Sequence, residues 1–368
     1  MSTADRRRCR RRGPVRSCDG RPGTRRIPRA CDTDETSETA FGQRTSRYRR
    51  RVGCKRWIAT GPAGVADFAF VDADVPQPGP GEVTIEVRAA GVNPADLKHV
   101  SRAAKFPVPI GYEVSGVLSA IGPGTEIASG GGAVGDEVLA FRVSGGYATA
   151  LTVPATTVFA KPPTLDFPDA AGLLLAGATA ADLLRVARVT NGDTILLHAA
   201  SGSVGVAVLQ LARRLGATVI GTAGPTGLAR VERFGGIAIP YGDGLLERIE
   251  TAAPQGLSVA LDAAGTDEAI DASLSLVYDR SRIVTIAAQT RAAADGFVAI
   301  GGNQPDSMAF RDEIRGELVQ LAERAELVVP IARTYPLSEA VAALALVASG
   351  KAGGKVALLA GNDTGSVS

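Results

Sequence analysis

Several kinds of residue are scarce in this chain, and each scarcity argues against a class of function. The 368 residues include two histidines, two methionines and four cysteines, and aromatic residues make up only 5%. So few histidines and methionines argue against a His-rich metal site and a Met-rich binding surface. The cysteines, Cys9, Cys18, Cys31 and Cys54, form no Cys-x-x-Cys pair, and none lies beyond residue 54. They predict no disulfide framework, and the cysteine-free remainder suits a reducing compartment.

Long apolar runs are also missing. No stretch of about 20 strongly apolar residues would span a membrane, and the first fifty residues lack the apolar segment of a signal peptide. The richest stretch, 170–184, is interrupted by Thr179 and Asp182. We therefore expect a cytoplasmic protein with no membrane partner.

The net charge of +2 conceals two unlike segments. Residues 1–53 contain 16 Arg and no Lys against 6 acidic residues, whereas the rest contains 24 basic and 32 acidic residues. A charged segment without apolar periodicity buries too little surface to offset its ordering entropy, so residues 1–54 are predicted to be a disordered Arg-rich extension. We favour an accessory tail or translated sequence upstream of the true start; a nucleic-acid-binding arm and a transit peptide are the alternatives. The mildly acidic remainder is not expected to bind nucleic acid.

Hydrophobic periodicity divides the remaining chain in two. From residue 55 to about 163, short alternating segments such as 82–88 predict strands separated by Gly and Pro. From about residue 166, short apolar strands alternate with helices, which is typical of a parallel, doubly wound sheet in an α/β protein. The predicted strands of this second part are 194–199, 218–222, 237–240, 258–262 and 282–286, and the predicted helices are 204–215, 226–234, 245–253, 266–277 and 311–325. A helix at 338–348 and a strand at 355–359 follow.

The strand at 194–199 leads into a loop of small residues, 200–205, and then into a helix. This order is that of a dinucleotide-binding turn. Gly202 would let backbone amides approach a pyrophosphate, Gly205 would let the helix pack close to the sheet, and the helix N-terminus would attract the phosphates. Because Ala200 replaces the first glycine of the G-x-G-x-x-G pattern, a tight turn without a ligand is the alternative.

The next strand indicates which dinucleotide would bind. An NAD site places an acidic residue about 20 residues after the glycines, but here no acid occurs before Glu232. A carboxylate at that place would repel a 2′-phosphate, so its absence favours NADP(H). Thr222, Thr226, Arg230 and Tyr241 are candidates to hold this phosphate, and an ordinary surface role is the alternative for each.

Six motifs occur in an order that resembles one known family. They are Ala90–Asp96, Gly111–Gly116, Gly135–Val138, Leu175–Ala180, the loop 200–205 and Gly353–Val356. Over about residues 55–361 the chain resembles the zinc-free quinone oxidoreductase-like (zeta-crystallin type) branch of the medium-chain dehydrogenase/reductase superfamily. This likeness implies a GroES-like β-rich catalytic domain, residues 55–177 completed by 328–361. It also implies an inserted Rossmann doubly wound parallel-sheet domain, residues 178–327, and a homodimer. Residues 362–368 are expected to form a flexible C-terminus.

The chain departs from the zinc alcohol dehydrogenases of the same superfamily. Asn93 stands where those enzymes carry Cys, and Tyr112 replaces the His of their G-H-E motif. A catalytic zinc needs three protein ligands, usually Cys or His, and residues 55–368 contain no cysteine. The Cys-rich lobe for structural zinc is missing too. We therefore expect no metal, which leaves hydride transfer to an already electrophilic quinone or α,β-unsaturated carbonyl as the preferred chemistry.

The resemblance also implies particular site residues. Asn93 would hold the nicotinamide ribose or the substrate carbonyl, and Lys98 and Tyr112 are candidate hydrogen-bond or proton donors. The alternatives are a turn-capping Asn93, a solvated Lys98 and a Tyr112 that fills the space of a zinc ligand. The residues expected to bind NADP(H) are Thr179, Ser201, Gly202, Ser203, Val204, Gly205, Thr222, Arg230, Tyr241, Ala264, Gly265, Ile286, Ala287 and Lys355. His99 and His198 are given no catalytic role.

The expected function is therefore NADPH-dependent reduction of a small-molecule quinone or enone without zinc. A non-catalytic NADPH-binding protein, structural or redox-sensing, is the main alternative. Nucleic-acid binding through the tail and a zinc-dependent alcohol dehydrogenase are the others.

Overall fold

The computed structural model describes residues 52–361, so most of the predicted Arg-rich extension, and residues 362–368, lie outside the described range. The first strand, β1 (Val52–Ala59), begins before the predicted end of the extension at residue 54. Cys54 is only 6% exposed in this strand and is a free thiol. Residues 52–54 therefore belong to the folded part.

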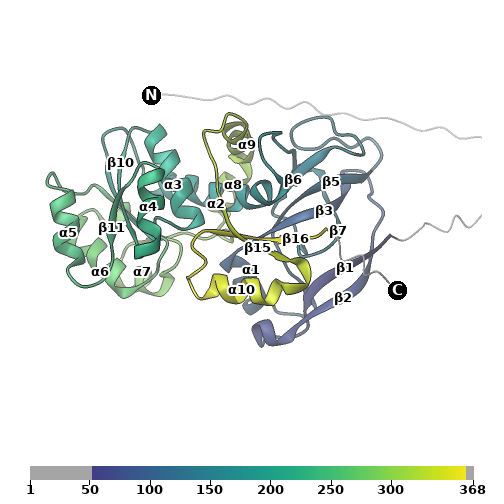
Figure 1. Ribbon diagram of the computed structural model, residues 1–368, viewed down its shortest axis with the longest axis horizontal. Helices are drawn as coiled ribbons and strands as arrows, with labels where there is room; N and C mark the ends of the chain where they lie inside the picture. The colour runs from purple at the N-terminus through teal and green to yellow at the C-terminus, as the bar shows by residue number, and fades with distance from the viewer. Residues whose placement is uncertain (1–51, 362–368) are drawn as a thin grey trace, which may run out of the picture. The chain divides into compact units, whose positions relative to one another are not determined.

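Two sheets build the β-rich region (Figure 1). Strands β2, β1 and β4 form the smaller one, and the larger has the order β15-β16-β3-β5-β6-β8 with β7 paired to β3. Their bounds are β2 Phe68–Val75, β3 Glu82–Val92, β4 Val108–Pro109, β5 Glu113–Ile121, β6 Glu137–Phe141, β7 Ala150–Pro154, β8 Val158–Ala160, β15 Ile331–Pro336 and β16 Lys355–Leu359. In β3 the apolar residues Val83, Ile85 and Val87 are fully buried, which confirms the alternating pattern read from the sequence. The C-terminal strand β16 pairs antiparallel with β3, so distant parts of the chain complete one sheet.

The second region is a six-stranded sheet with the order β11-β10-β9-β12-β13-β14, in which every pairing is parallel. Its strands are β9 Thr194–His198, β10 Thr218–Ala223, β11 Ile237–Pro240, β12 Val259–Asp262, β13 Ile283–Thr285 and β14 Val298–Ala299. The helices of this region are α3 Ser203–Arg214, α4 Leu228–Arg233, α5 Leu245–Ala252, α6 Asp267–Leu276 and α7 Gln289–Asp295, and they flank the sheet (Figure 1). This is the doubly wound α/β architecture that the alternating pattern predicted.

Helix α2 (Phe167–Val186) connects the two regions and packs on both. Asp166 caps its start by accepting a hydrogen bond from the Asp169 amide. By length and composition α2 is the one helix of the described residues that would be able to cross a membrane, yet 72% of its apolar window is buried inside the protein. It is therefore placed as a core helix, and the predicted domain boundary at 177/178 falls inside it.

The single helix predicted at 311–325 is instead two helices, α8 (Pro305–Glu313) and α9 (Arg315–Glu323), which meet at Ile314. Pro305 occupies the first turn of α8, where its missing N–H costs no helical hydrogen bond. The predicted helix therefore begins too late, and the break at Ile314 was not predicted. Two further helices complete the fold, α1 (Pro94–Ser101) and α10 (Ala340–Ala348).

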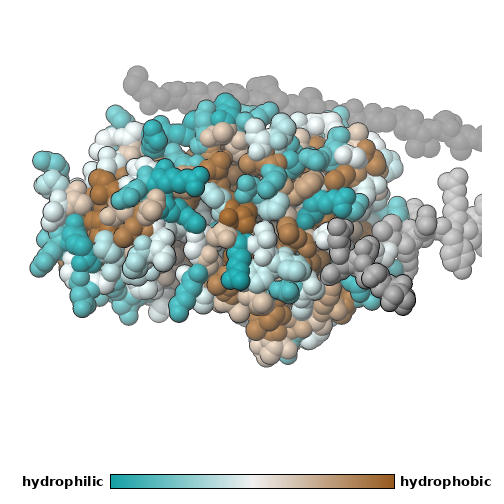
Figure 2. All heavy atoms as spheres, in the orientation of Figure 1, coloured by the Kyte–Doolittle hydropathy of each residue, from teal (hydrophilic) through white to brown (hydrophobic). Residues whose placement is uncertain are grey.

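On the face drawn in Figure 2, hydrophobic residues gather in several small patches separated by hydrophilic ones. The apolar side chains of the described part lie mostly in three buried clusters. One surrounds α2 and α3, one fills the β-rich region, and one lies beneath α5 and α6. The burial of these clusters is the main favourable term that fixes the two regions.

Candidate active site at the carboxyl edge of the parallel sheet

The predicted phosphate loop joins β9 to α3, and its geometry fits a dinucleotide. A Cβ placed at Gly205 would lie 2.5 Å from the carbonyl oxygens of Ala199 and Ala200, so only glycine lets α3 approach the strand this closely. A Cβ at Gly202 would lie 3.3 Å from the Ala199 carbonyl oxygen, a tight contact, and residues 201–204 are partly exposed. Gly202 is also the N-cap of α3 and supplies no capping side chain, so the first helical N–H groups suit an anionic ligand.

The missing first glycine of the motif has a structural explanation. Ala200 is fully buried, and a Cβ at Gly221 of the neighbouring strand would lie 2.6 Å from the Ala200 methyl group. The glycine at 221 thus provides the room that the alanine at 200 takes up. The positive φ of the turn, +58°, falls instead on Ala199, a conformation that is uncommon for a residue with a side chain.

Three predicted cofactor residues lie along the rim formed by the ends of β10 and β11. Tyr241 is 54% exposed. Its hydroxyl lies beside Gly224, where an added Cβ would be 2.8 Å from the hydroxyl oxygen. The Ser201 hydroxyl lies beside Gly227, where an added Cβ would be 2.5 Å from the hydroxyl oxygen. The Arg230 guanidinium lies against Gly354, which brings the C-terminal segment to the same rim.

Thr222 does not belong to this rim, and its burial disfavours the predicted role as a phosphate ligand. The residue is 1% exposed, and its hydroxyl pairs with His198 Nδ1 at 3.0 Å in the interior. The other ring nitrogen of His198 pairs with Ser273 at 3.2 Å. Burial lowers the pKa of His198 to about 4 even though Asp262 acts in the opposite direction, so the ring is neutral near pH 7. This supports the prediction that His198 is not catalytic.

Two residues that the sequence reasoning missed organise the ends of β12 and β13. Asp262, fully buried, accepts hydrogen bonds from the backbone amides of Ala264 and Gly265, both at 2.9 Å. The Thr285 hydroxyl donates to the same carboxylate at 2.6 Å and accepts from the Ala287 amide at 3.0 Å. The two loops therefore act as one unit. Asp262 and Thr285 are each the polar last residue of an otherwise apolar strand, and this pattern could have indicated their role from the sequence.

The predicted residues of these loops lie at the carboxyl edge of the sheet, where ligands of such sheets bind. Gly265 has a φ of +73°, and a Cβ there would lie 2.8 Å from the Ala287 side chain. Ala264 and Gly265 are exposed, and Ile286 and Ala287 are partly exposed. On α2, Thr179 is 5% exposed.

Lys355, predicted to bind the cofactor, is buried within the β-rich region. Lys355 is 1% exposed. Its Nζ donates a hydrogen bond to Asn93 Oδ1 at 2.6 Å and forms an ion pair with Glu113. The second Glu113 oxygen accepts the Leu175 amide of α2 at 3.0 Å. This burial and these two partners favour a positioning role for Lys355, and its predicted contact with the cofactor stays a prediction.

Asn93 is part of the same buried cluster. Its Nδ2 donates to Glu113 at 2.9 Å and to the Gly91 carbonyl oxygen at 3.3 Å, so both amide hydrogens have internal acceptors. The residue is 4% exposed and is the N-cap of α1. The structure thus favours a positioning role over direct contact of this amide with a substrate carbonyl.

Asp96, next to this cluster, was not singled out from the sequence. Its Oδ2 accepts hydrogen bonds from the Tyr147 hydroxyl and from the Asn93 amide, each at 2.8 Å, whereas Oδ1 is buried and has no hydrogen-bond partner. Burial raises the pKa of Asp96 to about 7, although Tyr147, Asn93 and Lys355 favour its ionised form. A carboxyl group that exchanges a proton near neutral pH therefore lies under the start of α1.

Tyr112 and Lys98 are the predicted catalytic side chains that keep some contact with solvent. Burial and then the Asp96 charge raise the pKa of Tyr112 to about 12, so the hydroxyl is protonated at neutral pH and can donate. Its ring lies edge-on to His99 at 5.2 Å between centroids. Lys98 is exposed on α1, and partial desolvation together with Arg102 lowers the pKa of its ammonium group.

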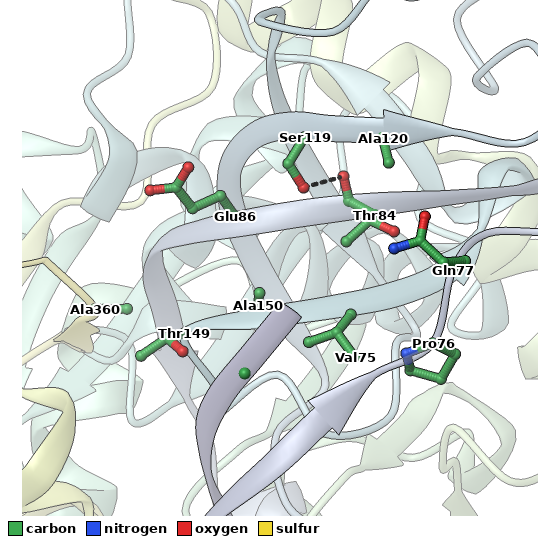
Figure 3. Close-up of a pocket in the computed structure, with 11 residues that line it drawn as sticks. Val75, Pro76, Gln77, Thr84, Glu86, Ser119, Ala120, Thr149, Ala150 and Ala360 are labelled. Atoms are coloured by element: carbon green, nitrogen blue, oxygen red, sulfur yellow. Dashed lines mark hydrogen bonds between the residues drawn. The ribbon is translucent and has the colours of Figure 1, made fainter. Parts of the chain in front are cut away.

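A cavity of about 440 Å³ lies apart from these residues, on the β-rich region (Figure 3). Its lining includes Val75, Thr84, Ser119 and Thr149, and the Ser119 hydroxyl donates to the Thr84 carbonyl oxygen at 3.3 Å. None of the predicted site residues lines it. The cavity is therefore not the site that the motifs predict.

A β-rich region completed by the C-terminal strand, together with a parallel sheet that carries a glycine-lined turn, defines a two-domain, nucleotide-dependent oxidoreductase. The alcohol dehydrogenase GroES-like domain matches residues 79–163, and the zinc-binding dehydrogenase domain matches residues 239–358. The chain belongs to the medium-chain dehydrogenase/reductase superfamily, in its quinone oxidoreductase-like branch.

Three relatives illustrate this placement. The synaptic vesicle membrane protein VAT-1 homolog of Rattus norvegicus is 34% identical over 199 residues, which are 52% of this chain and 48% of that protein. A mycobacterial protein solved in complex with NADPH is 29% identical, with a TM-score of 0.73 over 83% of this chain and 99% of that one. A quinone oxidoreductase of Pseudomonas syringae pv. Tomato DC3000 is 26% identical, with a TM-score of 0.72 over 83% and 99%. The chain spans about half the length of the curated VAT-1 relatives.

Proposed function

We propose that the protein is an NADPH-dependent reductase of a quinone or an α,β-unsaturated carbonyl compound and that it works without zinc. The observation that carries this proposal is the glycine-lined, partly exposed turn at 200–205 beside a rim with an exposed tyrosine and an arginine. The mycobacterial relative with NADPH and the Pseudomonas quinone oxidoreductase support it.

Bound NADPH would supply the hydride. The residues of this chain would hold the diphosphate at the start of α3, with Ser201, Gly202, Ser203 and Val204 presenting backbone and Gly205 admitting the helix. Tyr241 and Arg230 would take the 2′-phosphate, because a phenol donor and a guanidinium lie at that rim and no acidic residue precedes Glu232 in this segment.

Zinc independence is proposed from the residues at the two ligand positions. Asn93 offers an amide whose hydrogens and oxygen are engaged with Glu113, Gly91 and Lys355. Tyr112 offers a phenol whose pKa is raised to about 12 by burial and by Asp96, which disfavours the phenolate that a metal would need. A quinone or enone is already electrophilic, so a donor such as Tyr112 or Lys98 is sufficient to polarise its oxygen.

A homodimer and a cytoplasmic location remain predictions from the resemblance and from composition. The predicted dimer is testable by light scattering of the purified chain.

The function is tested by following NADPH absorbance with a panel of quinones and enones. We expect turnover with NADPH, much slower turnover with NADH, and no loss of activity on treatment with a zinc chelator. The variant Gly205→Val should lose NADPH binding, since its side chain would displace α3 from the turn. Tight NADPH binding without turnover of any acceptor would overturn the reductase proposal and leave a non-catalytic NADPH-binding protein.

A further inference from the structure

Four arginines gather where the catalytic region meets α2, α8 and α9. Asp182 accepts hydrogen bonds from Arg185 at 2.6 Å and from Arg311 at 3.0 Å. Asp312 pairs with Arg142 at 3.2 Å and with Arg315 at 3.3 Å. Four guanidinium groups therefore share two carboxylates in this cluster, which leaves positive charge without a matching anion.

Arg311 carries the clearest sign that a partner is missing. Its side chain is 8% exposed and Nε is bonded to Asp182, but Nη2 is buried and has no hydrogen-bond partner. Burial lowers the pKa of this guanidinium, Asp182 acts in the opposite direction, and the charges of Arg142 and Arg185 add smaller lowering effects. A buried donor without an acceptor is costly, so a ligand that supplies an anionic oxygen would stabilise this arrangement.

The cluster lies beside the proposed reaction site on two sides. The Arg142 amide donates to the Tyr112 carbonyl oxygen at 3.0 Å, and the Arg142 charge acts on the pKa of Tyr112 against the effects of burial and Asp96. The backbone segments of Arg142 and Tyr112 are therefore direct neighbours. On the other side, Arg311 Nη1 lies against Gly302, where an added Cβ would be 3.3 Å away, in the loop that follows β14. That loop belongs to the carboxyl edge of the sheet, where the cofactor is proposed to bind.

We propose that Arg142 and Arg311 form an anion-binding subsite next to Tyr112 and that the preferred substrates carry a carboxylate or another anionic oxygen group close to the reducible double bond. This inference rests on the proposed reductase function. Arginine suits the role, because its planar fork binds carboxylate-type oxygens in pairs. Arg142, 26% exposed in its side chain, is the more accessible of the two guanidinium groups, and Arg311, 8% exposed, is the more buried.

The same contacts also have a structural interpretation. Arg315 Nη1 donates to the Phe141 carbonyl oxygen at 3.1 Å, and the Arg142–Asp312 pair lies alongside, so the cluster fastens α8 and α9 to β6. A purely structural role predicts that removing a charge affects all substrates alike. An anion subsite predicts that only the anionic substrates are affected.

The test compares a neutral quinone with its anionic derivative, 1,2-naphthoquinone and 1,2-naphthoquinone-4-sulfonate. The wild-type protein should have a clearly lower KM for the sulfonate. In Arg142→Gln the KM for the sulfonate should rise about 10- to 100-fold, the range expected for one charge-assisted hydrogen bond, while the KM for the neutral quinone stays within about twofold. Arg311→Lys keeps the positive charge and loses the planar fork of the guanidinium. In this variant the KM for the sulfonate should rise less than in Arg142→Gln, and the KM for the neutral quinone should again change little. Arg214→Gln removes a surface arginine paired with Glu326 and is the matched control.

Equal losses on both quinones, or a wild-type protein that does not distinguish them, would overturn the subsite. A protein that reduces neither quinone would contradict the proposed function instead. The subsite is then judged by calorimetry on the NADPH-loaded protein with naphthalene-2-sulfonate, which has no carbonyl to reduce. Binding that is weakened in Arg142→Gln and unchanged in Arg214→Gln supports the subsite, and equal binding by all three proteins rejects it.

Discussion

The two regions of the molecule each contain a buried polar cluster, and the clusters are built on opposite principles. In the catalytic region the cluster is ionic. Lys355 and Glu113, each 1% exposed, form an ion pair, Asn93 bonds to both, and Asp96 keeps one oxygen without a partner.

The cluster of the nucleotide-binding region is held mainly by neutral hydrogen bonds. His198 is kept uncharged by burial, and its two nitrogens are matched to Thr222 and Ser273. Asp262, the one carboxylate, is bonded to Thr285 and to two backbone amides.

The comparison shows what each region requires. The ion pair ties the C-terminal strand β16 to β5 and to the start of α1, segments that are 242 and 262 residues apart in the chain. Buried charges are costly unless paired, so the loss of one partner is far more damaging than the loss of both. The neutral cluster fixes strand ends that already neighbour one another in the sheet, so each of its bonds contributes less.

The largest effect is expected for Lys355→Met, which leaves Glu113 buried without its counter-ion. The free energy of unfolding should fall by about 3–5 kcal/mol, measured by urea denaturation. The double variant Lys355→Met/Glu113→Gln should recover part of this loss because no uncompensated charge remains. Strictly additive losses of the two single variants would contradict the ionic description.

Asp96→Asn should change the pH dependence of stability. The folded pKa of about 7 lies above the ordinary value of 3.8, so the folded protein keeps a proton that the unfolded chain releases. Wild-type stability should therefore fall as the pH rises from about 4 to about 7, by up to about 1.4 kcal/mol per pH unit from this group. The variant should lack this component, which denaturation at a series of pH values would detect.

His198 should make the stability depend on pH in the opposite direction to Asp96, because its pKa is lowered in the folded protein whereas that of Asp96 is raised. Its folded pKa of about 4 lies below the ordinary 6.5, so the unfolded chain takes up the proton first as the pH falls. Its contribution to stability is present above pH 6.5 and is lost between about 6.5 and 4. If Asp96→Asn left the wild-type profile between pH 4 and 7 unchanged, the carboxyl would not carry a proton in the folded protein.

The sequence predicted the elements well where the signal is local. The predicted strands 237–240 and 355–359 coincide with β11 and β16. The predicted turn does lie between a strand and a helix, but α3 already begins at Ser203, inside the predicted loop 200–205. These segments are defined by short apolar runs and small residues, which act within a few positions of the chain.

The site could be predicted only in part, because its side chains are fixed by partners distant in sequence. Nothing near Lys355 indicates that Asn93 and Glu113 will surround it. Thr222 lies in a β10 segment that is buried on both faces, so strand parity did not show which way its hydroxyl points. Ala200 was read as a weakness of the motif because its compensating residue, Gly221, lies on another strand.

The smallest effect, and the sharpest check on the nucleotide-binding region, is expected for Thr222→Val. The change removes the hydroxyl that pairs with His198 and should lower the free energy of unfolding by about 1–2 kcal/mol. Since Thr222 lies in the interior and away from the rim, the NADPH dissociation constant should stay within about twofold. Tyr241→Phe, the matched variant on the exposed rim, should behave in the reverse way, with unchanged stability and weaker NADPH binding. A Thr222→Val protein that kept its stability and lost NADPH affinity would restore Thr222 as a phosphate ligand and would contradict the buried pairing with His198.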